Sequence, residues 1–456
     1  MTLTDPIPSA PRTRPLLGNA VALLHHPLRL LTSLPAQGDL VRIGFGPLPV
    51  YMVCSPELAH QVLMDDRTFD KGGLIFDRVR EVTGNGLTSC PHRDHRRQRR
   101  LIQPAFHRVR LSRYAEVMTE QIAEVSGSWR AGYPVDVLTA MQTITARTLV
   151  ATMFADSSLP DTVVEEMIDD LNTQVRGMYL RMFMPFALSR LPVLGNLRYQ
   201  QARARLRRAI GSIIANRRHS RSDQGDLLSA LLAARDSAGQ DGGGDQGLTD
   251  SELIDQCVTF FIAGTDTTAA VLAWALHLLA LNPDVEGQLH AEVDSVVAGA
   301  TATIDDLDRL RTTGSIITET LRLYPPIWLA TRTVTRDTRL GKHLLRAGTT
   351  IAYSPYVLQH RSDVYSDPER FAPDRWRSTE GAGRPPRGTL VPFGAGARKC
   401  IGDDFGVTEA TLTLASVARQ WRLTHVPGIR VRPALRAVLS PRGLHMLPTP
   451  RTDLGL

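Results

Sequence analysis

Cysteine is scarce in this chain of 456 residues. Its four cysteines, Cys54, Cys90, Cys257 and Cys400, lie far apart and include no Cys-x-x-Cys pair. This scarcity disfavours a disulfide-stapled domain and a zinc site built on paired cysteines. Free cysteines are typical of a reducing compartment, so we expect a cytoplasmic protein.

The N-terminus lacks a long apolar run and begins with polar, proline-rich sequence. This pattern indicates neither a signal peptide nor a membrane anchor. We therefore expect residues 1–20 to form an extended arm on a soluble protein that does not associate with a membrane.

A long basic tail is also missing, although the formal net charge is +7 and the isoelectric point is near 9.5. The arginines are densest between His92 and Arg110, and such a patch can dock an acidic protein or bind nucleic acid. No basic segment is interleaved with aromatic residues, so we expect no nucleic-acid partner. DNA binding that weakens with salt would favour that alternative.

One apolar stretch is long enough to cross a domain or a membrane. Thr249-Asp250-Ser251-Glu252 has the spacing of a capping box and predicts a helix start, and Asn282-Pro283 predicts its end. At 1.5 Å per residue, this helix would be about 45 Å long. Asp266 in mid-run would cost about 2.5–3.5 kcal/mol in a bilayer. We expect the buried central helix of a soluble protein.

The last cysteine lies in a glycine-rich segment that runs from Phe393 to Gly402. An isolated cysteine is most often a small buried hydrophobic residue. Here the glycines allow a tight turn, and backbone N–H groups at a following helix can stabilise Cys400 as a thiolate. A thiolate held in this way is a suitable axial ligand for iron.

The pattern Phe-x-x-Gly-x-Arg-x-Cys-x-Gly is matched at every fixed position and resembles the haem signature of the cytochrome P450 haem-thiolate monooxygenases. The resemblance implies that Cys400 binds the iron of haem b. It also implies that Arg398 pairs with a haem propionate, that Phe393 packs near the sulfur and that Gly402 belongs to the haem-binding site.

The middle of the expected central helix, residues 263–268, is similar to the oxygen-activation motif of the same family. The resemblance implies that Thr267 bonds the oxygen to be activated and that Asp266 helps to deliver protons. Gly264 would let a flat ligand lie against the helix. A bond from the threonine hydroxyl to its own helix is the structural alternative.

Further motifs agree with the resemblance in order and spacing. His95 and Arg99 are at i, i+4 spacing and would meet the haem propionates, as would Arg332. Glu319-x-x-Arg322 would form a buried structural lock with Arg375. We expect substrate contacts from the following residues: Phe260, Ala263, Leu329, Ala330 and Met178.

Other segments are expected to adjoin the pocket or to connect elements. We predict a long loop from Gly72 to Ser89 over the substrate. The cluster Met182-Phe183-Met184-Pro185 would belong to helices that roof the pocket, and residues 435–447 would reach it near the end of the chain. Asp236 to Gly247 has the composition of a flexible surface loop.

Taken together, the resemblance implies one mainly α (α+β) domain over residues 1–456, a triangular helical prism around haem with a small β-rich region. No fused reductase is expected, so electrons would come from a ferredoxin and its reductase. We expect a monomer that oxidises a hydrophobic small molecule with O2.

The His95–Phe106 stretch and residues 176–179 look similar to actinobacterial terpene oxygenases. A cyclic sesquiterpene such as pentalenene, oxidised in one or more steps at one carbon, is the expected substrate. A peroxide-driven enzyme and one that oxidises fatty acids or polyketides are the alternatives.

Overall fold

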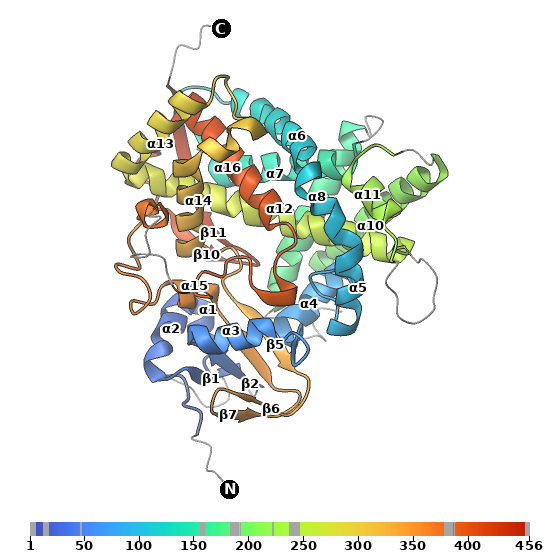
Figure 1. Cartoon of the computed structure of the whole chain (residues 1–456), viewed down its shortest axis with the longest axis vertical. Helices are drawn as coiled ribbons and strands as arrows, with labels where there is room; N and C mark the ends of the chain where they lie inside the picture. Colours follow the sequence, from blue (N-terminus) through green and yellow to red (C-terminus); the bar gives the residue numbers. More distant parts are fainter. Residues whose placement is uncertain are drawn as a thin grey trace.

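The computed structural model describes residues 6–11, 18–45, 48–155, 160–182, 191, 193–220, 223–236, 247–377, 386 and 388–451. Most of them are helical, and the strands of the largest sheet gather at the end of the molecule that holds the N-terminus (Figure 1). The α-helices are α1 Ala20–His25, α2 Pro27–Ser33, α3 Pro56–Met64, α4 Gly73–Thr83, α5 His92–Ile102, α6 Arg108–Gly127, α7 Val137–Met153, α8 Asp161–Met182, α10 Leu194–Ser220, α11 Leu227–Ala233, α12 Asp250–Leu281, α13 Pro283–Val296, α14 Arg311–Leu323, α15 Pro355–Gln359 and α16 Asp403–Gln420. Short 3-10 helices are η1 Pro35–Gln37, η2 Gln103–Phe106, η3 Ile304–Arg309, η4 Pro373–Trp376 and η5 Gly396–Arg398.

The largest sheet has the strand order β1-β2-β8-β5-β3, and only its β2–β8 pair is parallel. Strands β1 and β2 form an antiparallel pair in which Leu40 lies opposite Val53 and Phe45 opposite Leu48. The strands are β1 Leu40–Phe45, β2 Leu48–Val53, β3 Phe69–Asp70, β4 Val135–Asp136, β5 Ala330–Val334, β6 Thr338–Leu340, β7 His343–Leu345, β8 Thr350–Tyr353, β9 Trp421–His425, β10 Arg432–Leu435, β11 Leu439–Arg442 and β12 His445–Pro450.

The central helix α12 begins and ends where the sequence predicts. Thr249 accepts a hydrogen bond from the Glu252 N–H, the Glu252 carboxylate accepts one from the Thr249 N–H, and Asn282 is the C-cap. The helix is long and apolar enough to cross a membrane, but 72% of its most apolar window is buried inside the protein. It is therefore the core helix of a folded domain.

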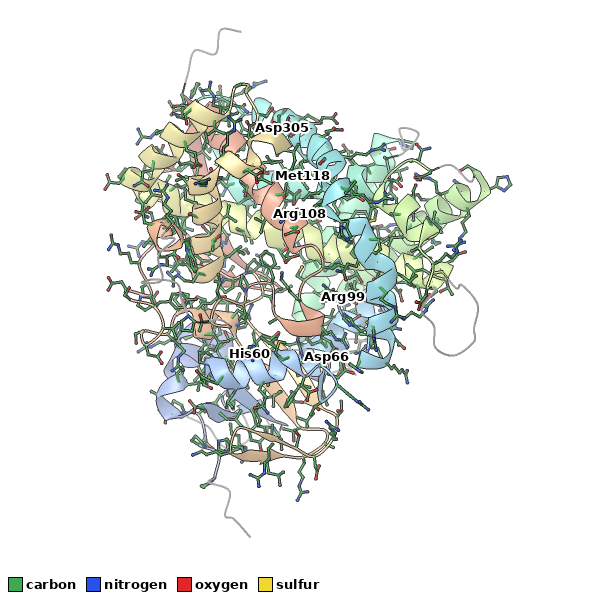
Figure 2. All side chains as sticks on the ribbon, viewed as in Figure 1. His60, Asp66, Arg99, Arg108, Met118 and Asp305 are labelled. Atoms are coloured by element: carbon green, nitrogen blue, oxygen red, sulfur yellow. The ribbon has the colours of Figure 1, made fainter. Side chains whose placement is uncertain are left out.

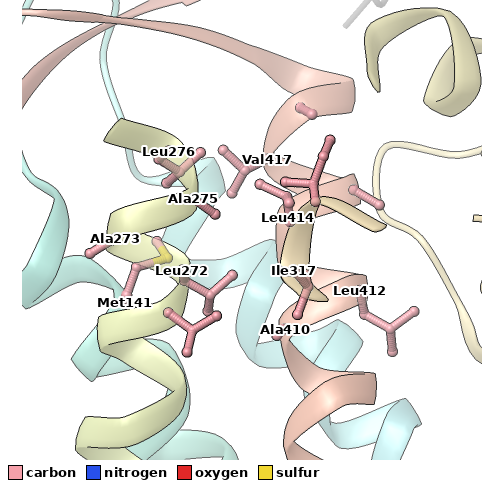
Figure 3. Close-up of a cluster of buried hydrophobic side chains, with 14 of the residues drawn as sticks. Met141, Leu272, Ala273, Ala275, Leu276, Ile317, Ala410, Leu412, Leu414 and Val417 are labelled. Carbon is pink, nitrogen blue, oxygen red and sulfur yellow. The ribbon is translucent and has the colours of Figure 1, made fainter. Parts of the chain in front are cut away.

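Helices α7, α14 and α16 surround α12 and form the largest apolar core with it. Figure 3 shows Leu272, Ala275 and Leu276 of α12 among apolar side chains from α7, α14 and α16. Burial of these helix faces fixes α12 relative to α16, which starts directly after the cysteine loop.

The prediction of a long loop from Gly72 to Ser89 was wrong, because residues 73–83 form the helix α4. Only one face of α4 carries apolar side chains, with Phe76 and Val82 buried and Val79 half-buried. The segment is short and begins at a glycine, so its local sequence only weakly favours a helix. Packing against α8, α12 and β5 decides its conformation.

Between residues 92 and 234 the described chain is mainly helical, in α5, α6, α7, α8, α10 and α11. Part of the N-terminal arm is described, and Ser9 pairs with Arg42 beside β1. Residues 183–185 of the methionine-rich cluster and residues 237–246 of the expected surface loop lie outside the described residues.

Candidate functional site

An internal cavity separates the middle of α12 from the cysteine loop. Side chains from α4, α5, α8, β5 and the turn between β10 and β11 complete its wall. All five predicted substrate-contact residues line it, and so do Ala437 and Val438 in the segment expected to reach the pocket. No Asp or Glu is among the described residues of the cavity wall.

The cysteine loop has a backbone that requires glycine. Gly394 and Gly396 have φ of 69° and 67°, and a Cβ on Gly396 would come within 2.4 Å of the Leu63 carbonyl oxygen. The Cys400 N–H donates to the Phe393 carbonyl oxygen at 2.9 Å, which closes the loop. These constraints present Cys400 to the cavity.

Burial and the nearby positive groups act in opposite directions on the charge of the Cys400 thiol. Burial raises the pKa of the Cys400 thiol, while the Gly402 N–H and the cations Arg99 and Lys399 act to lower it. A cationic partner at this site would favour the thiolate further. The donor set suits a metal ion that binds sulfur.

Buried cations gather at one side of the cavity. The Arg332 side chain is 3% exposed, and its two hydrogen bonds go to neutral oxygens, the Thr331 carbonyl at 2.8 Å and the Tyr353 hydroxyl at 3.2 Å. His95 and Arg99 also line this part, and burial together with Arg398 and Arg99 lowers the pKa of His95 to about 3.

Lys71 belongs to this cation group and was missed in the sequence. Its ammonium lies 4.3 Å from the centre of the Phe76 ring, and burial, followed by Arg332 and Arg398, lowers the pKa of Lys71 well below its usual value. Buried cations in such number are costly unless an anion joins them. Lys71 is one of only three lysines in the chain, a weak signal that could have singled it out.

Arg398 lines the same cavity but already has protein partners. Its Nε donates to Asp66 at 3.0 Å, one Nη to Asp70 at 2.8 Å and the other to the Cys90 carbonyl oxygen at 2.8 Å. Asp66 follows α3 and Arg99 lies on α5 (Figure 2). These bonds hold the arginine beside the cavity, and its pairing with a propionate stays a prediction.

The segment of α12 that faces the cysteine has a specific hydrogen-bond pattern. The Thr267 hydroxyl donates to the Ala263 carbonyl oxygen at 2.6 Å, which is the structural alternative considered for this threonine. Asp266 accepts a hydrogen bond from Gln142 of α7 at 2.7 Å. Gly264 lines the cavity, and a Cβ there would also approach Leu149 of α7 at 3.1 Å.

The residues of the predicted lock are brought together. The fully buried Glu319 and Arg322 form two hydrogen bonds at 2.8 and 2.9 Å, and Arg375 donates to Glu319 at 3.0 Å. Trp376 also donates to Glu319, and the backbone carbonyl of Arg370 accepts from Arg322. The lock ties α14 to the chain around η4, so its contribution is structural.

Comparison with known proteins identifies the family. The model of the cytochrome P450 family matches residues 8–449. This chain belongs to the cytochrome P450 family. The P450DA haem domain has a crystal structure that superimposes with a TM-score of 0.86 over 99% of each chain at 24% identity, which confirms the predicted fold.

Three Streptomyces proteins are 43% identical to this chain. Cyclooctat-9-en-7-ol 5-monooxygenase of Streptomyces melanosporofaciens matches over 92% of this chain and 90% of its own length. Pentalenene oxygenase of Streptomyces avermitilis matches over 97% of both chains, and cyclooctatin synthase of S. melanosporofaciens over 97% and 95%. The predicted family and enzyme class, a P450 monooxygenase, are confirmed.

The residues present fit the haem that family membership implies. The thiol side chain of Cys400 faces an apolar cavity, and the cation group formed by Lys71, Arg99 and Arg332 would compensate the charge of two propionates, with neutral His95 beside it as a hydrogen-bond donor. A P450 monooxygenase also takes a hydrophobic substrate, O2 and electrons from a redox partner.

Proposed function

We propose that residues 1–456 form a single haem b domain that inserts one oxygen atom into a cyclic terpene. The reaction consumes O2, two electrons and two protons, and it releases the oxidised substrate and water. The observation that supports this proposal is the apolar cavity between Cys400 and the Ala263–Thr267 segment of α12. We further propose that the protein is a cytoplasmic monomer.

The side chains of this protein would hold the haem and orient the substrate. Cys400 would hold the iron, and the cation group would hold the propionates and fix the plane of the ring. The haem, when bound, supplies the redox chemistry by which dioxygen is reduced and cleaved. Phe260, Ala263 and Leu329 would orient the substrate and exclude water from the cavity.

Proton delivery is assigned to Asp266 and Thr267. Burial raises the pKa of the Asp266 carboxyl, against the Gln142 hydrogen bond and the charges of Arg436 and Arg176. A carboxyl with a raised pKa can carry a proton near neutral pH. The Thr267 hydroxyl lines the cavity and can pass a proton inward.

A terpene substrate is supported by the lining and by the relatives. The wall contributed by α4, α8 and α12 is mainly apolar, and its cations gather at the inferred propionate positions. The curated relatives carry names of terpene oxidations, pentalenene and cyclooctat-9-en-7-ol among them. A cyclic sesquiterpene such as pentalenene, oxidised once or repeatedly at one carbon, is the specific substrate that we propose.

An acidic ferredoxin, reduced by its reductase, is the proposed electron donor. Arg96 is exposed on α5, whose Arg99 bonds the Lys399 carbonyl oxygen of the cysteine loop. Lys399 and Arg108 are also exposed, Lys399 beside Asp403 and Arg108 3.9 Å from Asp404. This surface, defined as the donor face, is cationic and close to Cys400. Arg97 and Arg100 of the same cluster are instead paired with Glu252 and Asp236.

The first experiment is the carbon monoxide difference spectrum of the reduced protein. We expect the long-wavelength Soret band of thiolate-ligated haem in the wild type and its loss in Cys400→Ser. Cys54→Ser is the matched control, because Cys54 is buried in the chain after β2 and does not line the cavity. Retention of the band in Cys400→Ser would contradict the assignment of Cys400.

The second experiment tests the substrate. Reconstituted enzyme with a [2Fe–2S] ferredoxin and its reductase is incubated with pentalenene, cyclooctat-9-en-7-ol and long-chain fatty acids. Turnover of a terpene with ferredoxin supports the proposal. Turnover of fatty acids alone, or activity with hydrogen peroxide and none with ferredoxin, would overturn it.

A further inference from the structure

Helix α7 makes two side-chain bonds to one short segment of α12. Gln142 donates its amide Nε2–H to Asp266 Oδ1 at 2.7 Å, and Thr145, one turn further along α7, donates its hydroxyl to the Thr265 carbonyl oxygen at 2.9 Å. Residues at i and i+3 lie on one face of a helix. Both bonds therefore come from the face of α7 that packs on α12.

The two helices approach closely at this point. A Cβ on Gly264 would come within 3.1 Å of Leu149, which lies on the same face of α7. Because Thr145 is buried and α7 and α12 share the main core, the position of Gln142 relative to Asp266 is fixed by packing. Packing therefore holds the Gln142 amide in bonding position to the Asp266 carboxyl. The comparisons with known proteins assign no role to Gln142.

The bond separates the two residues of the proposed proton path. Asp266 is bonded to α7, while the Thr267 hydroxyl donates to the Ala263 carbonyl oxygen within α12. Thr267 lines the cavity. Transfer from the carboxyl to this hydroxyl therefore needs the carboxyl to leave the amide, or a water to join the two groups.

The strength of the Gln142–Asp266 bond depends on the charge of the carboxyl. A hydrogen bond to a carboxylate is roughly twice as strong as one to a neutral carboxyl. Loss of a proton from Asp266 therefore strengthens its bond to Gln142, and gain of a proton weakens it.

We infer that Gln142 is a positioning residue that holds the Asp266 carboxylate against α7 and releases the carboxyl once it is protonated. This inference rests on the proposed proton role of Asp266. The released acid donates one proton toward the Thr267 hydroxyl, which passes one proton to the oxygen in the cavity. The carboxylate left behind returns to the amide and takes its next proton from solvent.

The charged groups around Asp266 are compatible with this cycle. Arg176 of α8 and Arg436 of the β10–β11 turn are the cations that act on its charge, and both side chains are exposed. Their charges favour the carboxylate form. Gln142 is the neutral partner on the third neighbouring element, α7.

The test compares Gln142→Leu, which removes the donor at similar size, with Thr143→Val on the same helix. Within the part of the chain that the structure describes, the Thr143 side chain bonds only the Thr139 carbonyl oxygen of its own helix. The first readout is the carboxyl C=O infrared band, titrated in difference spectra against Asp266→Asn. Because the amide stabilises the charged form, we expect the midpoint to move to higher pH in Gln142→Leu and to stay in Thr143→Val.

The second readout is the fraction of donor electrons that ends in hydrogen peroxide rather than in product, measured with pentalenene and the ferredoxin system. We expect a rise of about 2- to 5-fold in Gln142→Leu, well below the roughly 10²- to 10⁴-fold that general acid–base catalysis contributes, because Asp266 itself is retained. The carbon monoxide band and the spectral Kd for the substrate should be unchanged. Gln142→Asn, whose shorter amide falls short of Asp266, replaces the leucine variant if that variant does not fold.

Two results overturn the inference in different ways. An unchanged midpoint and peroxide fraction in Gln142→Leu, with both readouts altered in Asp266→Asn, would remove the role of Gln142 and leave the proposed function intact. An unchanged peroxide fraction in Asp266→Asn would remove the proton role of Asp266 itself.

Discussion

At the scale of single residues, burial decides which side chains can change their charge. Cys400 borders the cavity and Asp266 is next to the wall residue Thr267, while Glu409 of α16 is 1% exposed and lies next to the hydroxyls of Thr148 and Thr268. Burial raises the pKa of the Glu409 carboxyl to about 8, and the two threonines oppose this only in part. A neutral acid in the core is therefore the stable form near neutral pH.

Glu409 makes folding stability depend on pH. Between its unfolded pKa near 4.5 and its folded pKa of about 8, the folded protein retains a proton that the unfolded chain releases. Stability should therefore fall as pH rises through this window. Glu409→Gln should flatten the fall and stabilise the protein at pH 8.5 by on the order of 5 kcal/mol.

Denaturant unfolding at pH 5 and pH 8.5 measures this effect. Glu124→Gln is the control, because Glu124 is exposed on α6 and should leave the pH dependence unchanged. Parallel pH profiles for wild type and Glu409→Gln would contradict the buried neutral acid.

At the scale of elements, buried polar networks join segments that the sequence separates. The lock formed by Glu319, Arg322 and Arg375 connects α14 to the chain around η4, more than 50 residues away. Glu319 also accepts the Ala372 N–H at 3.0 Å. Each partner satisfies a charge that would otherwise be buried alone.

Removal of one partner should therefore be costly. We expect Glu319→Gln to destabilise the protein by about 3–5 kcal/mol, because it leaves Arg322 and Arg375 with an uncompensated charge. Arg346→Leu is the matched control, since the Arg346–Asp337 pair is exposed and should contribute less than about 1 kcal/mol. Thermal unfolding of both variants measures the difference. Equal losses of stability would show that the buried lock contributes no more than an exposed ion pair.

At the scale of the whole molecule, the distribution of charge separates a donor face from the rest of the surface. Arg108 is exposed at the start of α6, and Figure 2 shows it on the helical part of the molecule above Arg99. Arg29 of α2 is also exposed but belongs to the sheet end (Figure 1). The net charge of +7 alone does not distinguish these two arginines.

Electron transfer should therefore be sensitive to Arg108 and insensitive to Arg29. We expect Arg108→Ala to slow reduction by ferredoxin several-fold at low ionic strength, with a smaller effect at high salt because charges are screened. Arg29→Ala should behave as wild type. Stopped-flow reduction at two salt concentrations measures both, and equal rates for the three proteins would contradict the donor face.

The sequence by itself determined the features that depend on local order. The capping box at Thr249, the end of α12 at Asn282, the hairpin of β1 and β2 and the glycine-rich turn before Cys400 are set by residues a few positions apart. The family resemblance added the positions that line the cavity, from Met178 to Ala330. These features could be predicted because short-range spacing fixes them.

Only the tertiary structure decided the features that depend on distant partners. Helix α4 forms because α8, α12 and β5 cover its apolar face, and the burial of Lys71 follows from the meeting of β3, α4 and β5. The bond from Gln142 to Asp266 joins residues 124 positions apart. No pattern in the sequence signals it, because packing of α7 on α12 creates the contact and the desolvation that gives it its strength.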